Sequence, residues 1–173
     1  YTLEPLADGL KITKNPIGVL TNNPPFPYHL HNLSNYMALS PLPPENRLDI
    51  PLEVYSRGMG AIGLPGDLSS ASRFIRASFT KQNSLHPENE TEAVSQFFHI
   101  LGSVCQQAGC VRIGDGFEKT VYSSCCNTDR GIFYYTCYDN SQITAVHLHH
   151  EELNASQITK YPLRTKQHFL MEN

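Results

Sequence analysis

The chain has 173 residues, 40% of them hydrophobic and 17% charged, which suits one soluble globular domain with a sizeable core. Its formal net charge of −3 argues against nucleic acid or an anionic membrane surface as the main partner. No apolar run approaches the roughly 20 residues of a membrane span, so the sequence predicts neither a nucleic-acid partner nor a membrane partner.

Short strands are expected at the beginning of the chain. Residues 1–6 look like the interior of a strand-rich protein rather than a translation start, so we expect the chain to begin partway through a domain. The apolar segments 10–12 and 17–20 flank the turn sequence Lys-Asn-Pro at 14–16, which predicts a β-hairpin. Asn22 follows the second segment. Asparagine at a strand end is usually a turn residue, and the functional alternative is an amide donor directed into a site.

A helix and a long irregular segment come next. Apolar residues recur at helical spacing between positions 26 and 39 and predict an amphipathic helix; they are Phe26, Leu30, Leu33 and Met37. Residues 40–51 are rich in proline and polar residues. An irregular segment of this length is typically a lid, an interface or disorder.

The stretch 63–76 combines turn residues with a helix start. Glycine and proline at positions 63, 65 and 66 predict a turn, and good N-cap residues precede a helix over residues 69–83. Arg73 lies within about one turn of that helix N-terminus, which is the unfavourable end of the helix dipole for a cation. Arg73 is therefore either an exposed arginine paired with Asp67 or a residue with a function of its own.

The remaining sequence predicts one more helix and a β-meander. An apolar stripe between residues 94 and 104 indicates the helix. Segments 120–125, 132–138 and 143–148 are rich in strand-forming residues and are joined by short turns, which predicts three antiparallel strands. Helices in the middle and strands at both ends predict an α+β fold with helices packed on antiparallel sheet. Residues 163–173 form a tail without a clear pattern.

Two histidine motifs raise the question of a metal site. In a strand, His147 and His149 would share a face that a metal ion could use, and His150 follows them. His29 and His31 have the same spacing. Neither motif has a third ligand of matching strength in the sequence, so we expect solvated histidines and neither a metal nor another cofactor.

The five cysteines do not form a convincing disulfide framework. Their number is odd and two of them, Cys125 and Cys126, are adjacent, which favours a reducing, cytoplasmic location. These two alternate across a predicted strand, so one is expected to face the core as a small apolar residue. No cysteine has an adjacent base in the sequence, so an internal cysteine nucleophile is not supported.

Several sequence segments occur together in the order that one enzyme family shows. They are Asn15-Pro-Ile-Gly-Val-Leu-Thr-Asn-Asn-Pro24, Asn32-Leu-Ser-Asn-Tyr36, Tyr55-Ser-Arg-Gly-Met-Gly60, residues 63–74, Phe97-Phe-His-Ile-Leu-Gly-Ser-Val104, Tyr122-Ser-Ser-Cys-Cys-Asn127 and Tyr138-Asp-Asn-Ser-Gln-Ile-Thr144. Together they resemble the choloylglycine hydrolase family, which includes bile salt hydrolases and penicillin V acylases. They most resemble the bile salt hydrolases of Gram-positive gut bacteria.

The resemblance implies the fold of N-terminal-nucleophile hydrolases, in which two stacked antiparallel sheets lie between helical layers. Residues 1–173 would be the C-terminal part of this αββα sandwich. In the family the nucleophile is a cysteine exposed as the mature N-terminus, and its own α-amine serves as the base because that group titrates near neutral pH. This chain has no such cysteine, so we expect it to be inactive alone.

Two positions of the family's site match residues of this chain. The resemblance implies that the Asn22 amide helps hold the oxyanion and that Arg73 supports the nucleophile region electrostatically. It also implies that residues 35–62 form an arm reaching a neighbouring subunit of a homotetramer. Three functions stay open: a hydrolase of glycine- or taurine-conjugated bile salts, a penicillin V acylase, and a catalytically inactive remnant or association domain.

Overall fold

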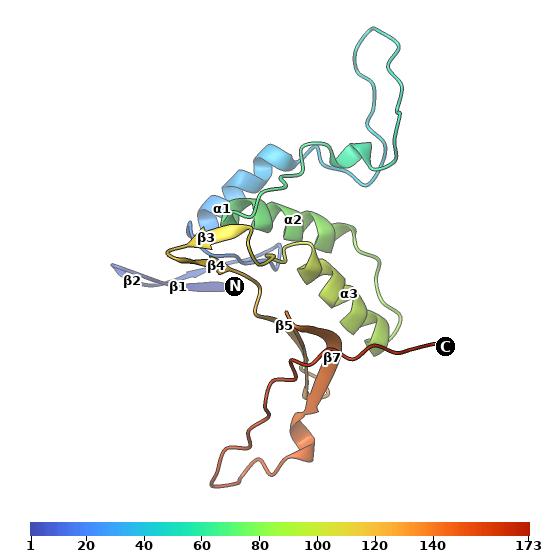
Figure 1. The fold of residues 1–173 in the computed structure, drawn as a ribbon. Coiled ribbons are helices and arrows are strands. Elements are labelled where there is room, and N and C mark those ends of the chain that lie inside the picture. The colour runs from blue at the N-terminus through green and yellow to red at the C-terminus, as the bar shows by residue number, and fades with distance from the viewer. The chain divides into compact units, whose positions relative to one another are not determined.

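The computed structural model describes residues 1–173, which divide into two compact units, Tyr1–Leu85 and His86–Asn173 (Figure 1). Each unit combines α-helical segments with antiparallel strands, two helices in the first unit and one in the second, so the predicted α+β class is confirmed. None of the helices has the length and apolar character that crossing a membrane requires.

The first unit begins with a β-hairpin. Its strands are β1 (Thr2–Leu6) and β2 (Gly9–Thr13), and Leu3 pairs with Ile12 in the antiparallel register. Alternate residues on the two strands share a face, so Leu3, Leu10 and Ile12 gather on one side of the hairpin and Leu6 lies on the other.

The predicted hairpin between segments 10–12 and 17–20 is wrong, because residues 17–20 form no strand. The cause is a local hydrogen-bonded turn. The Asn15 side chain accepts a hydrogen bond from the Gly18 N–H at 2.8 Å and donates one to the Val19 carbonyl oxygen at 3.0 Å. A side chain that satisfies the backbone in this way competes with pairing in a sheet.

Two helices, α1 (Phe26–Leu33) and α2 (Ser70–Asn83), pack against each other in the first unit. Helix α2 begins where the sequence predicts, because the Ser69 side chain caps it by accepting a hydrogen bond from the Ser72 N–H at 3.3 Å. The rings of Phe26 and Phe74 meet edge to face with centroids 6.2 Å apart. The largest fully buried side chains are Phe26, His29, Phe74, Ile75 and Ser78.

Helix α1 is shorter than the predicted 26–39. It ends at Leu33 and is followed by a 3-10 turn at Ser34–Tyr36, since serine and asparagine are weak helix formers. The chain then runs as a long loop without helix or strand until the 3-10 turn Met59–Ala61 (Figure 1). The base of this loop is closed by a hydrogen bond of 2.9 Å from the Ser40 N–H to the Gly60 carbonyl oxygen.

The second unit contains a helix and the predicted meander, which is confirmed. Helix α3 (Glu90–Gly102) packs on the first strand of a three-stranded antiparallel sheet with the order β5-β6-β7. The central strand contributes the buried side chains of Ile132, Tyr135 and Cys137. The strands are β5 (Tyr122–Asn127), β6 (Ile132–Cys137) and β7 (Asn140–His147).

A second small hairpin, which the sequence reasoning missed, precedes this sheet. Its strands, β3 (Val111–Ile113) and β4 (Gly116–Glu118), are too short to show an alternating pattern. Gly114 forms the turn between them with a φ of 54°, a conformation that favours glycine. After β7 a 3-10 turn at Leu148–His150 leads into a segment without helix or strand.

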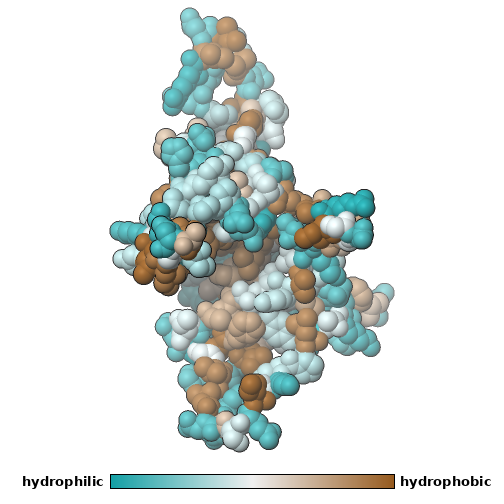
Figure 2. Space-filling model, turned by 90° about the vertical axis from the view of Figure 1, so that its left-hand side faces the viewer, coloured by the Kyte–Doolittle hydropathy of each residue, from teal (hydrophilic) through white to brown (hydrophobic).

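Large hydrophobic side chains are exposed in both units (brown in Figure 2). On the β1–β2 hairpin, Leu3, Leu10 and Ile12 are 61%, 62% and 62% exposed. In the second unit, Tyr122 of β5 and Phe133 of β6 are 58% and 41% exposed. Contiguous apolar surface of this kind is typical of a face that binds another surface.

Candidate active site

The two predicted site residues, Asn22 and Arg73, are hydrogen-bonded to each other. Arg73 Nη2 donates to Asn22 Oδ1 at 2.6 Å, although 51 positions separate the residues in sequence. A guanidinium group carries only donors, so the amide atom that faces it is the oxygen. The Asn22 side chain is exposed. Its two Nδ2 N–H groups are therefore the donors that remain for an acceptor from outside the chain.

The half-buried Arg73 side chain is held in place at the start of α2. Its Nε donates to the Leu68 carbonyl oxygen at 3.1 Å, in the turn that precedes the helix. The guanidinium thus donates to two oxygen atoms, each at the negative end of its own dipole. These contacts offset the unfavourable position of a cation near a helix N-terminus.

The alternative of an ion pair between Arg73 and Asp67 is wrong. The Asp67 carboxylate instead accepts hydrogen bonds from the Ser69 N–H at 2.9 Å and the Ser72 hydroxyl at 2.5 Å. Hydrogen bonding by Ser69 and Ser72 lowers the pKa of Asp67 from 3.8 to about 2, against a small opposing effect of burial. Asp67 therefore stabilises the start of α2, and Arg73 contacts Asn22.

Helix α2 also holds the segment that carries Asn22. Near the far end of α2, Lys81 Nζ donates to the Ile17 carbonyl oxygen at 2.6 Å. At the first turn of α2, the Ser70 carbonyl oxygen accepts a hydrogen bond from the Thr21 hydroxyl at 3.1 Å. Both ends of helix α2 therefore hold residues 17–22, and this fixes the position of Asn22 relative to Arg73.

The expectation that His29 and His31 are both solvated is wrong for His29, and the sequence reasoning missed its role. The two side chains do not converge: His29 is fully buried on the inner face of α1, whereas His31 is exposed. The His29 ring lies with Nε2 at 2.9 Å from the Asn22 backbone carbonyl oxygen. A sequence signal existed in its spacing, because His29 lies three residues after the core residue Phe26 on the same helix face.

The histidines near residue 150 do not form the arrangement that the sequence suggested. Strand β7 ends at His147, so His147 and His149 do not share a strand face. The rings of His147 and His150 are stacked instead, with centroids 4.0 Å apart. Burial and then the nearby His150 lower the pKa of His147. No group of three or more His, Cys, Asp or Glu side chains is arranged to hold a metal ion.

All the cysteines are free thiols. Cys125 is half-buried and Cys126 is exposed, which is the alternation expected across a strand. Burial, followed by the neighbouring Cys126, raises the pKa of the Cys125 thiol. A raised pKa disfavours the reactive thiolate, so Cys125 is not an activated nucleophile.

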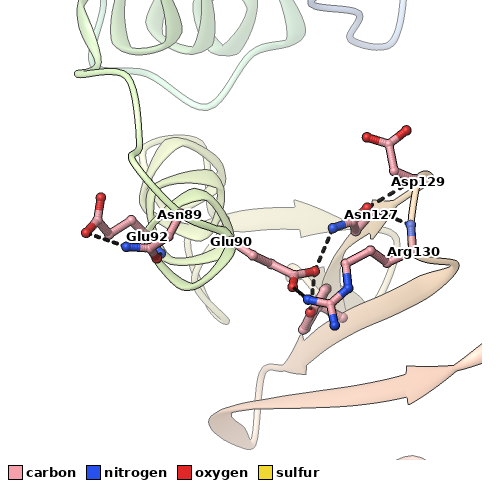
Figure 3. Close-up of polar contacts among 7 residues, drawn as sticks. Asn89, Glu90, Glu92, Asn127, Asp129 and Arg130 are labelled. Atoms are coloured by element: carbon pink, nitrogen blue, oxygen red, sulfur yellow. Dashed lines mark hydrogen bonds and ion pairs between the residues drawn. The ribbon is translucent and has the colours of Figure 1, made fainter.

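Glu90 is a second polar centre that the sequence reasoning did not identify, and it joins α3 to the β5–β6 hairpin (Figure 3). Its Oε1 accepts from Asn127 Nδ2 at 2.6 Å and from the Tyr134 hydroxyl at 3.0 Å, and Oε2 accepts from Arg130 Nη1. The hydrogen bond from Asn127 is the largest cause of a lowered Glu90 pKa. A carboxylate occupied on both oxygens, with a lowered pKa, is a poor general acid or base. Its role is structural.

Comparison with known proteins places this chain in a family. Residues 1–161 match the family described as linear amide C–N hydrolases, choloylglycine hydrolase family. A bile salt hydrolase/transferase of Lactiplantibacillus plantarum is 55% identical over 174 residues, which cover 99% of this chain and 54% of that protein. A bile salt hydrolase/transferase of Clostridium perfringens is 36% identical over 162 residues, covering 92% of this chain and 49% of that protein.

The chain also superposes on solved structures. The crystal structure of a mutant conjugated bile acid hydrolase from Clostridium perfringens superposes with a TM-score of 0.86 at 34% identity, covering 99% of this chain and 53% of that one. Penicillin V acylase from Agrobacterium tumefaciens shares the fold alone, with a TM-score of 0.65 at 18% identity, covering 85% of this chain and 41% of that one. The chain spans about half the length of the curated relatives it matches. It belongs to the choloylglycine hydrolase family of linear amide C–N hydrolases.

Proposed function

We propose that this chain is the C-terminal part of an enzyme that hydrolyses the amide bond of glycine- or taurine-conjugated bile acids. The observation that carries the proposal is the hydrogen bond of 2.6 Å between Arg73 Nη2 and Asn22 Oδ1. It joins the two residues that match the family's site, in a chain that is 55% identical to a protein named bile salt hydrolase/transferase.

In the proposed reaction an N-terminal cysteine thiolate, supplied by a part of the enzyme outside these residues, attacks the amide carbonyl carbon. The carbonyl oxygen becomes an oxyanion, and the Nδ2 N–H groups of Asn22 donate to it. The C–N bond then breaks, and the leaving amine of glycine or taurine receives the proton that the α-amine of the cysteine took from the thiol. Water then hydrolyses the acyl-cysteine and frees the thiol. Arg73 strengthens the donor, because a cation on the amide oxygen polarises the whole amide.

We further propose that residues 35–62 form a subunit-association arm of a homotetramer. The loop exposes apolar side chains that a monomer has no reason to present; they include Leu42, Leu48, Ile50, Leu52, Val54 and Tyr55. A cytoplasmic location is the matching proposal for a chain whose cysteines are all free. The tail at 163–173 carries no functional assignment.

A chimera tests the proposed activity. This chain replaces the segment that it matches in the Lactiplantibacillus plantarum bile salt hydrolase/transferase, and release of glycine from glycocholate is compared with hydrolysis of penicillin V. We expect the chimera to prefer glycocholate. A clear preference for penicillin V would favour the acylase alternative, for which the fold is the present support. A folded chimera inactive on both substrates would favour the inactive remnant.

A further inference from the structure

We infer that His29 is a positioning residue for Asn22: its ring N–H holds the Asn22 backbone carbonyl and thereby fixes where the side-chain amide is presented. This inference rests on the proposed function of Asn22 as the oxyanion donor. His29 touches neither substrate nor the reacting atoms and acts only through Asn22.

The hydrogen-bonding partners determine which ring nitrogen carries the proton. His29 Nε2 lies 2.9 Å from the Asn22 carbonyl oxygen, which can only accept. Nε2 therefore carries the hydrogen and donates it. The Thr21 hydroxyl lies 3.4 Å from the same nitrogen and gives its own hydrogen to the Ser70 carbonyl oxygen. Thr21 and Asn22 thus both contact one imidazole nitrogen, and the Thr21 hydroxyl links that nitrogen to the start of α2.

Packing prevents the His29 ring from turning away. The side chain is fully buried, and its ring stacks on Phe74 with centroids 4.9 Å apart and an interplanar angle of 18°. The Tyr28 ring meets it edge-on at 5.8 Å. Phe74 directly follows Arg73 in α2. One rigid ring therefore contacts both segments that supply the Asn22–Arg73 pair.

The Nδ1 atom of His29 indicates that the ring has a role beyond core packing. His29 Nδ1 is buried and has no hydrogen-bond partner. A buried polar atom without a partner is destabilising, so a ring needed only for packing would be better as phenylalanine. The Nε2–H group explains why the residue is a histidine, because it donates a hydrogen bond to the Asn22 carbonyl oxygen.

Three substitutions in the chimera separate the donor from the ring. His29→Gln can place an amide N–H where Nε2 lies, His29→Asn is too short to reach that position, and His29→Phe keeps the ring but removes the donor. We expect kcat for glycocholate to fall about tenfold or more in the Phe and Asn variants and less than about threefold in the Gln variant, because small misplacements of a catalytic group are costly. We expect KM to change less than about twofold, since His29 does not bind substrate.

Two results with these single variants would overturn the inference. One is equal kcat in the Gln and Asn variants, and the other is failure of all three variants to fold, which would make His29 a core residue only. A double-variant comparison adds a second test. In the Asn22→Ala background, His29→Phe should lower kcat less than about twofold, because there is no amide left to position.

A tenfold loss in that background would show that His29 acts independently of Asn22 and would also overturn the inference. The kcat of Asn22→Ala alone distinguishes failure of the inference about His29 from failure of the proposed function. If Asn22→Ala leaves kcat unchanged, the proposed oxyanion role itself is wrong, whatever His29 does.

Discussion

Replacing Asn22 by alanine should abolish most of the activity and little of the stability. The change removes the Nδ2 donor proposed for the oxyanion, and one such donor typically stabilises the transition state by about 2.7–4 kcal/mol. That range corresponds to a fall in kcat of about 100- to 1,000-fold. Asn22 is exposed and Arg73 keeps its 3.1 Å hydrogen bond to the Leu68 carbonyl oxygen, so water can replace the lost amide.

The stability change should accordingly stay below about 1 kcal/mol, or a shift in unfolding temperature of about 2–4 °C at most. The assay is release of glycine from glycocholate by the chimera, with unfolding followed by circular dichroism. Asn23→Ala is the matched control, because Asn23 is the adjacent exposed asparagine and the hydrogen bonds of Arg73 go to Leu68 and Asn22. A fall in kcat of less than threefold for Asn22→Ala, or an equal fall for Asn23→Ala, would refute the oxyanion role of Asn22.

Other predictions concern stability and assembly. Because its pKa is lowered in the folded state, Glu90 contributes stability that is full above its ordinary pKa of 4.5 and is lost as pH falls through the lowered value. Glu90→Gln should therefore flatten the acid side of the unfolding-temperature profile, and an unchanged profile would count against this contribution. Phe74→Ala should destabilise by about 3–5 kcal/mol in denaturant titration, because the ring is fully buried; a loss below 1 kcal/mol would contradict the packing described. Gly60→Ala should weaken assembly measured by light scattering, because an added Cβ would lie 1.9 Å from the Leu42 carbonyl oxygen at the base of the arm. An unchanged molar mass would argue against the arm. The chain alone should bind the dye ANS through its exposed apolar strands, and negligible binding would show that those surfaces are covered.

Local chemistry determined which parts of the fold could be predicted from the sequence. Helix α2 was predictable because the capping interaction of Ser69 involves neighbours only. The three strands of the β5-β6-β7 sheet were predictable because each is long enough to show its composition. The strand expected at 17–20 does not form, and the cause is again local. The Asn15 side chain hydrogen-bonds to the backbone of this apolar segment and holds it as a turn.

Contacts between distant residues explain what the sequence pattern could not predict. Nothing in periodicity or spacing joins Asn22 to Arg73. The sequence left a function open for each residue, and the family resemblance then indicated both as site residues. His29 was expected to be solvated, and its burial and its hydrogen bond to the Asn22 carbonyl oxygen depend on how α1 packs on α2. The hydrogen bonds of Glu90 could not be predicted for the same reason, because its partners lie 37 to 44 positions away in sequence.

The central claim is that Asn22 and Arg73 act as one unit on the oxyanion. A double-mutant cycle on kcat for glycocholate tests it most directly, using Asn22→Ala, Arg73→Ala and the double variant in the chimera. If Arg73 acts through the Asn22 amide, the double variant should be slower than Asn22→Ala by less than about threefold. If the two single losses multiply in full, the residues act independently, and the hydrogen bond between them has no part in catalysis.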